Sequence, residues 1–229
     1  MNRISTRSII LTRINYAEAD RIITFLTPSN GKVRAIAKGV RKAKSKLAGG
    51  IELFSISDIG VIEGRSEIGT LVSSRLITYF SNIVSDINRT LLGYEMLKII
   101  NRALEDEGGE EFFDLLGDTL SILNNLESPI ELAETSFIMR LMGLLGHEPN
   151  LTTDVQGKPL AEGALYLFSL DSMGLAPSKR GNLNQNHIKL LRLLSHNKPE
   201  ALLVVKGLAK HLKELAPLVR SMARQYVVR

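Results

Sequence analysis

Seven basic side chains lie within one short segment, GKVRAIAKGVRKAKSKLAGG at residues 31–50, with no acidic residue among them. They are Lys32, Arg34, Lys38, Arg41, Lys42, Lys44 and Lys46. Like charges this close repel one another and destabilise the fold unless something outside the chain neutralises them. Two interpretations follow. The segment is either a solvated basic loop or a binding surface for a polyanion.

The charge of the whole chain is distributed as unevenly as this segment suggests. Residues 1–50 carry eleven Lys and Arg, which include Arg13 and Arg21, against Glu18 and Asp20, a net charge of +9. Because the full chain has a net charge of +5, the remaining residues carry −4. A cationic first domain on a mildly acidic protein is typical of contact with nucleic acid or another anionic surface.

Other residues capable of chemistry do not form a catalytic pattern. Residues 64–70 have the rhythm of a phosphate-binding loop but lack its lysine, so they predict a hairpin turn. The histidines, His147, His187, His196 and His211, are scattered without metal-ligand spacing, which favours surface or capping roles. The acidic cluster at residues 105–111 lies at a helix start, where carboxylates favour the helix dipole. We therefore expect no catalytic residue, no metal, no cofactor and no enzyme activity.

The first eighty residues predict a β domain that could present the basic segment. Short runs rich in β-branched residues alternate with turn residues, giving strand candidates at 8–13, 21–27, 32–38, 51–62 and 68–80. Within residues 32–38 the cations and Ile36 alternate with Val33, Ala35 and Ala37, so the cations share one face. Five short strands are closed most economically by a small OB-type barrel, which leaves no exposed edge. Residues 1–80 are therefore predicted to be a nucleic-acid-binding domain.

From residue 81 onward the apolar period becomes helical, so the chain as a whole belongs to the α+β class. A first helix is predicted to carry an apolar face that ends near Leu104 and is formed by Ile87, Leu91, Tyr94 and Lys98, with Leu92, Leu97 and Ile100 beside them. A helix with Ser128 as its N-cap runs to Gly146, and Pro217 should kink or divide the last helix, at residues 208–228. Residues 81–229 form the helical domain, and its residues 147–182 are an irregular insert rich in Gly and Pro.

Composition also indicates the compartment. The chain has no cysteine, so it has neither disulfides nor a thiolate metal site, which suits a reducing compartment. Its N-terminus lacks the apolar core of a signal peptide, and its aliphatic runs are too short to span a bilayer. We expect a cytoplasmic protein that is not embedded in a membrane.

The stretch YAEADRIITFLTPSNGKVRAIAKGVRKAKSKLAGGIELFS, residues 16–55, resembles the bacterial RecO recombination-mediator family. The ordered elements are EADR, LTP, GKVRAIAKG and KSKLAG. A weaker resemblance continues through FIMRLMGLLGHEP, residues 137–149. The resemblance implies an N-terminal OB domain and a C-terminal helical domain. It also implies that the protein binds single- and double-stranded DNA, anneals complementary strands, and works with RecR to load RecA onto DNA coated by single-strand-binding protein.

The insert departs from this family. Many members carry a four-cysteine zinc site there, whereas the matching stretches here are residues 153–157 and 174–180, with every cysteine replaced. We therefore expect the insert to hold no metal and to be stabilised by packing. The apolar residues available for that packing are Leu160, Leu165, Leu167, Phe168 and Leu175.

The resemblance further implies that the helical domain receives the acidic, apolar-ended tail of single-strand-binding protein. Such a tail needs an apolar groove with cations at its rim. Arg140 matches an arginine in the family's F-x-x-R-L stretch, and Lys98 and Arg102 are further candidates. Each of these side chains is equally consistent with a solvated helix cation.

Three features favour DNA over a solvated loop for the basic segment. The cations of residues 32–38 share a strand face, small residues follow in the loop, and the segment lies in an OB-type domain, whose strands and loops commonly track phosphates. The chain has no tryptophan, and Tyr16 and Phe25 are either stacking or core residues. Binding should be dominated by phosphates. A protein-interaction scaffold and a module for an anionic surface are the alternatives.

Overall fold

The computed structural model describes residues 3–64, 67–104 and 109–227. Contacts between residues divide the chain into two compact units, Met1–Leu126 and Glu127–Arg229. The boundary predicted at residue 80 coincides with the change from strands to helices, whereas the compact units meet after Leu126. Each unit is described by itself.

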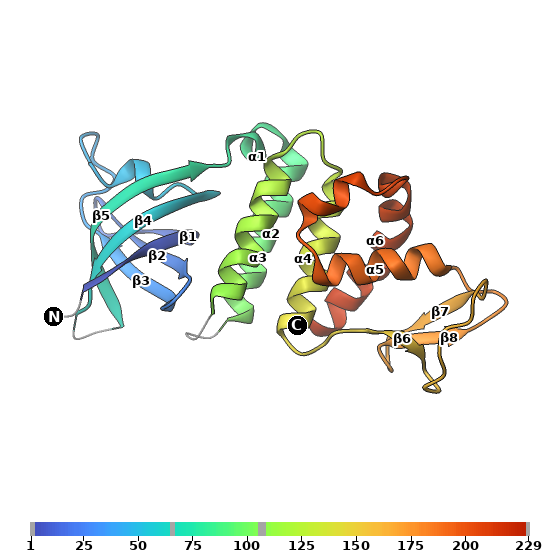
Figure 1. Ribbon diagram of the computed structural model, residues 1–229. Helices are drawn as coiled ribbons and strands as arrows, with labels where there is room; N and C mark the ends of the chain where they lie inside the picture. Colours follow the sequence, from blue (N-terminus) through green and yellow to red (C-terminus); the bar gives the residue numbers. More distant parts are fainter. Residues whose placement is uncertain (1–2, 65–66, 105–108, 228–229) are drawn as a thin grey trace. The chain divides into compact units, whose positions relative to one another are not determined.

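The first unit begins with a closed barrel of five strands, drawn in blue to cyan in Figure 1. The strands are β1 (Arg3–Tyr16), β2 (Asp20–Thr27), β3 (Gly31–Ala37), β4 (Ser55–Ile62) and β5 (Ile68–Tyr79). Their order around the barrel is β1-β2-β3-β5-β4, with β3 and β5 parallel and the other neighbours antiparallel. The predicted OB-type barrel is confirmed.

The barrel interior is filled by alternate residues of its strands. Phe25 on β2 is fully buried and faces Val33 on β3, and Ile23 faces Ala35 in the same register. On β3, Gly31, Val33, Ala35 and Ala37 are buried, while Lys32, Arg34 and Ile36 lie on the opposite face. The predicted alternation of this strand is therefore correct, because a strand's side chains point to its two faces in turn.

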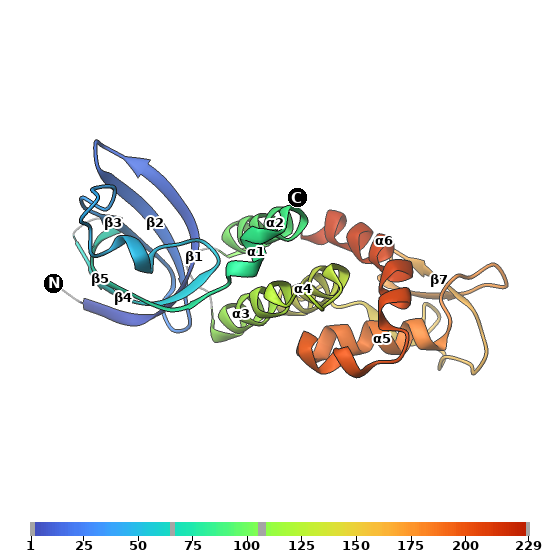
Figure 2. The same cartoon turned by 90° about the horizontal axis from the view of Figure 1, so that it is seen from above.

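Three helices complete the first unit: α1 (Ser81–Ser85), α2 (Ile87–Ala103) and α3 (Glu110–Asn124) (Figures 1 and 2). Helix α2 contacts β1, and α3 contacts both β1 and β2. The outer face of β1 and β2 is therefore apolar as well as the inner one, and Ile9, Leu11 and Leu26 are buried. A strand that is covered on both faces has a continuous run of apolar residues in its sequence, as Ile9–Leu11 does.

The buried face of α2 matches the predicted one only in part: Leu97 and Ile100 are buried, whereas the row that begins at Ile87 is not. Ile87, Leu91 and Tyr94 are 69%, 60% and 48% exposed. The face that packs also contains Arg89 and Gly93. The Arg89 guanidinium donates to the carbonyl oxygens of Leu123, Asn125 and Leu126 at the end of α3, at 2.6, 3.0 and 3.2 Å.

Gly93 fixes how α2 meets the barrel. A Cβ atom at this position would lie 2.7 Å from the Phe54 ring, so only glycine lets the helix approach. Phe54 is 1% exposed and adopts a positive φ of 58°, which an L-residue rarely does. Tertiary contact at these two positions therefore selects which part of the predicted apolar face is buried: the side with Leu97 and Ile100 and not the side with Ile87 and Leu91.

The second unit is built around α4 (Ile130–Leu144), which packs against α5 (Gln185–His196) and α6 (Leu208–Tyr226). Helix α4 starts without the side-chain cap predicted at Ser128 and ends before Gly146, whose φ of 76° confirms the predicted stop. A 3₁₀ segment, η2 (Pro199–Val204), precedes α6. Helix α6 continues through Pro217 instead of dividing there, because apolar residues on both sides of it are buried.

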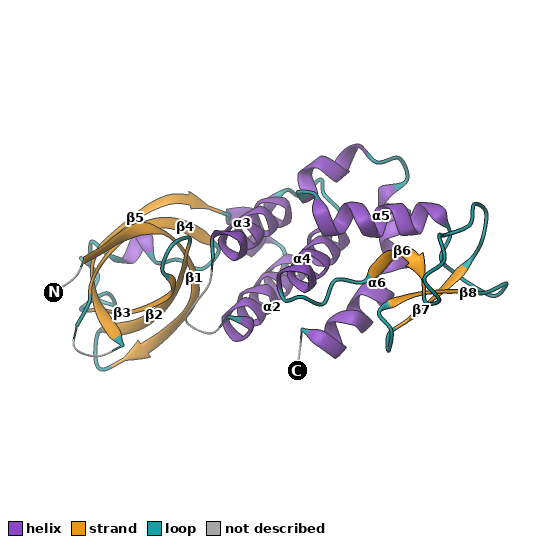
Figure 3. Ribbon diagram, turned by 60° about the horizontal axis from the view of Figure 1, so that its bottom comes forward, coloured by secondary structure: helices purple, strands orange, loops and turns teal. Residues whose placement is uncertain are grey.

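The insert is more regular than the sequence predicts. It contains β6 (Asn150–Asp154), β7 (Tyr166–Ser169) and β8 (Gly174–Pro177), which form a sheet in the order β6-β8-β7 (Figure 3). Strands of four or five residues separated by glycines and prolines carry too little period to be recognised in a sequence.

Backbone hydrogen bonds stabilise the insert together with the packing that the sequence predicts. The buried Asp154 carboxylate accepts the backbone N–H groups of Gln156 and Lys158, at 2.8 and 2.9 Å. This turn occupies the first of the two stretches where many relatives carry cysteines. Of the five residues predicted to pack, Leu175 is fully buried, whereas Leu165 and Leu167 are exposed. Tyr166, Leu151 and Leu183 supply the remaining core.

Candidate nucleic-acid interface

Strand β3 presents its two cations in different ways. The Lys32 ammonium donates to the carbonyl oxygen of Asn101, at 3.1 Å, in the last turn of α2. This is the negative end of the helix dipole, so the charge is neutralised within the unit. Arg34 is exposed. The predicted row of Lys32, Arg34 and Lys38 thus contains two cations that face solvent and one that stabilises a helix end.

The exposed Arg34 borders a hollow of mixed charge. The hollow has a volume of about 450 Å³ and is lined by Lys32 and Arg34 together with Glu63 and Glu67. Two carboxylates in the same hollow weaken its attraction for a phosphate. This end of β3 is therefore a poorer anion site than its sequence suggests.

The loop after β3 gathers more cations than this strand, although Glu18 and Asp20 also line the hollow beside it. Lys38, Arg41, Lys42, Lys44 and Lys46 are all exposed. The backbone N–H of Gly39 donates to Asp20 Oδ1 at 2.7 Å, and that of Arg41 donates to the carbonyl oxygen of Ala19 at 2.9 Å. The loop is therefore anchored to the β1–β2 turn, and its charges are presented from a defined backbone.

A hollow lies between this loop and that turn. Its volume is about 650 Å³, and it is lined by residues 17–20 on one side and by Lys38, Gly39, Arg41 and Lys42 on the other. The Arg41 guanidinium also donates to the carbonyl oxygen of Glu18, at 3.1 Å. We call residues 38–46 the cation loop; its side chains can contact successive phosphates of a strand lying along it.

Arg13 and Arg21, which the sequence analysis also assigns to DNA binding, have partners within the barrel domain. The Arg13 guanidinium pairs with Glu52 Oε2 at 2.8 Å and donates to the carbonyl oxygen of Ile51. Arg21 is half buried and donates to Asn15 Oδ1 at 3.2 Å. Arg13 therefore anchors the segment before β4, and Arg21 lies at the margin of the interface.

The structure separates the two aromatic candidates. Phe25 is fully buried in the barrel, so it is a core residue. Tyr16 is 50% exposed at the end of β1, where it pairs with Asp20, one of the residues that line the hollow beside the cation loop. Tyr16 is therefore the aromatic ring available for stacking on a base.

Comparisons with known proteins show which family the chain belongs to. Residues 1–80 match the family described as Recombination protein O N terminal, and residues 84–229 match Recombination protein O C terminal. The chain belongs to the RecO family. It is 30% identical over 226 residues to the DNA repair protein RecO of Dehalococcoides mccartyi, covering 96% of this chain and 88% of the relative. It is 29% identical to that of Acetivibrio thermocellus, with coverages of 86% and 81%.

Membership of the RecO family assigns the chain to DNA repair. No helix in the described parts of the chain is long and apolar enough to cross a membrane. The stretch at residues 64–70, which has the rhythm of a phosphate-binding loop, connects the antiparallel strands β4 and β5. At Gly69 in this stretch, an added Cβ would lie 2.6 Å from the Val61 side chain. Arg65 and Ser66 of that stretch lie outside the described residues.

The residues predicted to bind the tail of single-strand-binding protein lie on two helices. Lys98 and Arg102 are exposed on α2, in the first unit. Arg140 is half buried on α4, in the second unit. Lys98 follows Ile87, Leu91 and Tyr94 on the exposed face of α2, so an apolar row and a cation share that face. Their role in tail binding stays a prediction.

The structure brings together residues that the sequence left scattered. His187 on α5 and His211 on α6 both contact the Glu214 carboxylate. Hydrogen bonding from His187 holds the pKa of Glu214 below its ordinary value, and His211 and Lys210 act in the same direction. The sequence signal was limited to His211 and Glu214, three residues apart on one helix, because His187 joins them only through the packing of α5.

The acidic cluster at residues 105–111 has the role expected of a helix start where it is described. Glu110 and Glu111 lie in the first turn of α3, near the positive end of its dipole. Residues 105–108 lie outside the described residues.

Proposed function

We propose that this protein is a non-enzymatic DNA-binding mediator of recombinational repair in the cytoplasm, and that the cation loop is its main DNA contact. The observation that carries the proposal is five exposed cations on a loop anchored beside a hollow of about 650 Å³. Cations neutralise phosphates and release condensed counterions, which gives affinity without sequence preference. Contacts of this type suit a protein that acts on any damaged region of a chromosome.

Membership of the RecO family supports a finer proposal. We infer that the protein anneals complementary strands and, with RecR, helps to load RecA onto DNA coated by single-strand-binding protein. Annealing requires that two strands be held close while their bases remain free to pair. Phosphate contacts along the cation loop support this, because they leave the base edges exposed.

Contact with single-strand-binding protein is the second part of the proposal. An acidic, apolar-ended tail needs an apolar surface and a nearby cation. The exposed face of α2 supplies Ile87, Leu91 and Tyr94, and Lys98 continues it by one turn. Arg102 is exposed in the last turn of the same helix. Arg140, which is half buried, is a weaker candidate than its sequence position indicates.

A strand-annealing assay tests the proposal. Complementary oligonucleotides, bare or coated with single-strand-binding protein, are mixed with the protein, and duplex formation is followed by fluorescence quenching. The proposal expects acceleration in both conditions, and loss of the acceleration on coated strands when Leu91 and Lys98 are replaced by Asp and Glu. Acceleration of neither reaction would overturn the mediator role.

Binding to anionic lipid vesicles, measured at the same salt concentration, separates the two alternative functions. A module for anionic surfaces would bind vesicles as well as oligonucleotides. A scaffold with incidental charge would bind RecR and neither of the other two.

A further inference from the structure

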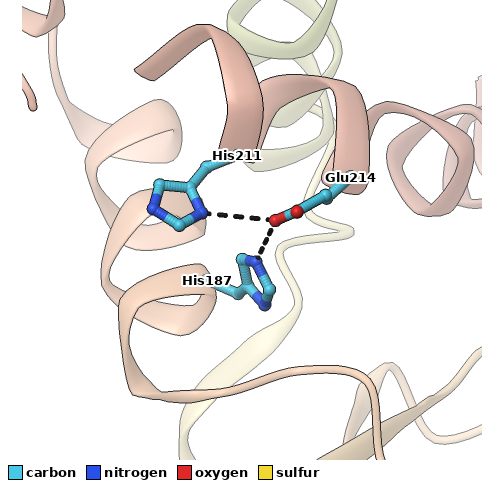
Figure 4. Close-up of side chains that lie close together, drawn as sticks. All are labelled: His187, His211 and Glu214. Atoms are coloured by element: carbon cyan, nitrogen blue, oxygen red, sulfur yellow. Dashed lines mark hydrogen bonds and ion pairs between the residues drawn. The ribbon is translucent and has the colours of Figure 1, made fainter. Parts of the chain in front are cut away.

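Two histidines and a glutamate of the second unit converge at the first turns of α5 and α6. His187 is the third residue of α5, and His211 and Glu214 are one turn apart near the start of α6. Figure 4 shows both imidazole rings directed at the Glu214 carboxylate. His187 Nε2 lies 2.8 Å from Glu214 Oε2, and His211 Nδ1 lies 3.4 Å from the same oxygen. All three ligand atoms lie within 4.8 Å of one another.

We propose that His187, His211 and Glu214 form a binding site for a divalent cation of the zinc class. Tetrahedral zinc holds nitrogen and oxygen ligands at about 2.0–2.2 Å, which places neighbouring ligand atoms about 3.3 Å apart. The two contacts on Glu214 Oε2, at 2.8 and 3.4 Å, lie on either side of that value. The two ring nitrogens lie within 4.8 Å of each other, so the imidazoles need to approach one another to enclose an ion.

The donor set favours one class of metal. Imidazole nitrogens suit zinc, copper and nickel, whereas magnesium and calcium require oxygen ligands. Two histidines and one carboxylate provide three protein ligands, and such sets leave the fourth position to water. A hollow of about 420 Å³ is lined by these three residues and by residues 182–184, so the fourth position has room for solvent.

Binding of the ion changes the tautomer of His187 by proton exchange with solvent and releases no net proton from that ring. The backbone N–H of Asn184 donates to His187 Nδ1 at 3.4 Å, so in the metal-free protein the ring proton lies on Nε2 and points at Glu214. When the ion takes Nε2, that proton moves to Nδ1 and the contact with the Asn184 N–H is lost. The other hydrogen bonds of Asn184, the N-cap residue of α5, are kept, because its Oδ1 still accepts the N–H groups of Asn186 and His187 at 2.9 and 3.1 Å.

Two features lower the affinity of this site for a metal ion. The Lys210 side chain lines the same hollow, and its charge opposes a cation there. Protons compete with the metal for both imidazoles, so binding weakens as the pH falls. A bound ion would link α5 to α6 and would make the melting temperature of the protein depend on zinc.

Zinc and cobalt titrations of the full chain, without a polyhistidine tag, test the site. After treatment with chelator, we expect one Zn²⁺ per chain by calorimetry, visible absorption of tetrahedral Co²⁺, and a higher melting temperature with zinc. His211→Ala should weaken zinc affinity by about tenfold or more, since even the loss of a residue that only supports a ligand has an effect of that size. His196→Ala is the matched control, because His196 pairs with Glu148 at 3.0 Å and is not part of the proposed metal site.

The outcomes separate a built site from surface binding. No uptake of zinc, or equal loss of affinity in His196→Ala and His211→Ala, would overturn the proposal. Glu214→Gln keeps a hydrogen-bond acceptor for His187 while removing the charge, so it tests the carboxylate if His211→Ala does not fold. Circular dichroism checks the fold of each variant, and Glu214→Gln that binds zinc as tightly as the wild type would also contradict the site.

Discussion

Replacing three lysines of the cation loop tests whether its charges contact phosphates. The variant carries Lys38→Gln, Lys42→Gln and Lys44→Gln, all at exposed positions for which the structure shows no side-chain hydrogen bond or ion pair. Lys32 and Arg41 are left in place, because the first donates to the end of α2 and the second to the β1–β2 turn. The substitutions therefore remove charge without removing a structural contact.

The expected effect follows from counterion release. Each phosphate contact on a single strand contributes about −0.7 to the slope of log K against log salt, so three lost contacts flatten the slope by about 2. Between about 50 and 200 mM salt, the wild type should then lose about 20-fold more affinity than the variant does. The loss should be similar for oligonucleotides of unrelated sequence, because phosphates carry no sequence information.

The control variant removes the same charge from the second unit. It carries Lys158→Gln, Lys179→Gln and Lys189→Gln, which are exposed, so both variants change the net charge from +5 by three units. Fluorescence anisotropy with a labelled single strand measures the slope of all three proteins. Equal slopes for the wild type and the cation-loop variant would refute the assignment of the interface. Equal flattening in the two variants would mean that overall charge, and not the loop, sets the affinity.

Three further predictions concern stability. Gly93→Ala should destabilise the first unit by about 1–3 kcal/mol, since the added Cβ would lie 2.7 Å from the buried Phe54 ring; chemical denaturation measures this, and an unchanged midpoint would contradict it. Lys32→Gln should lower the stability of the first unit by about 1 kcal/mol and leave the salt slope of DNA binding unchanged. A flatter slope would mean that Lys32 contacts DNA. For Glu214, a lowered pKa means that its contribution is complete above the ordinary glutamate value and is lost as the pH falls through the lowered pKa. The melting temperatures of Glu214→Gln and the wild type should therefore differ at neutral pH and converge in acid, and a difference that grew in strong acid would show the sign to be wrong.

The barrel was predictable because its strands carry strong local signals. Alternation in β3 and turn residues between the strands identify faces and ends without knowledge of the tertiary fold. The buried face of α2 was predictable only in part. Leu97 and Ile100 were predicted correctly, but the helix is apolar on more than one side, and Gly93 and Arg89 select the buried side through contacts with Phe54 and with the end of α3.

The cation loop was predictable as a charged segment but not as an interface in detail. The sequence gives the number of cations, whereas the hydrogen bond from Lys32 to Asn101 spans 69 residues. Arg13 is similar, because Glu52 is 39 residues away along the chain. A sequence shows which side chains are charged, and only the fold shows which of them already have a partner.

The packing of α2 and α3 on the outer face of the barrel determines where the chain can be cut. A fragment that ends at residue 80 would leave Ile9, Leu11 and Leu26 in water, although each is at most 3% exposed in the whole protein. It would also remove the acceptor of the Lys32 ammonium. Apolar patches of this kind promote self-association. A DNA-binding fragment that remains monomeric should therefore extend to residue 126, because the helices then cover the apolar outer face of the barrel and prevent its aggregation.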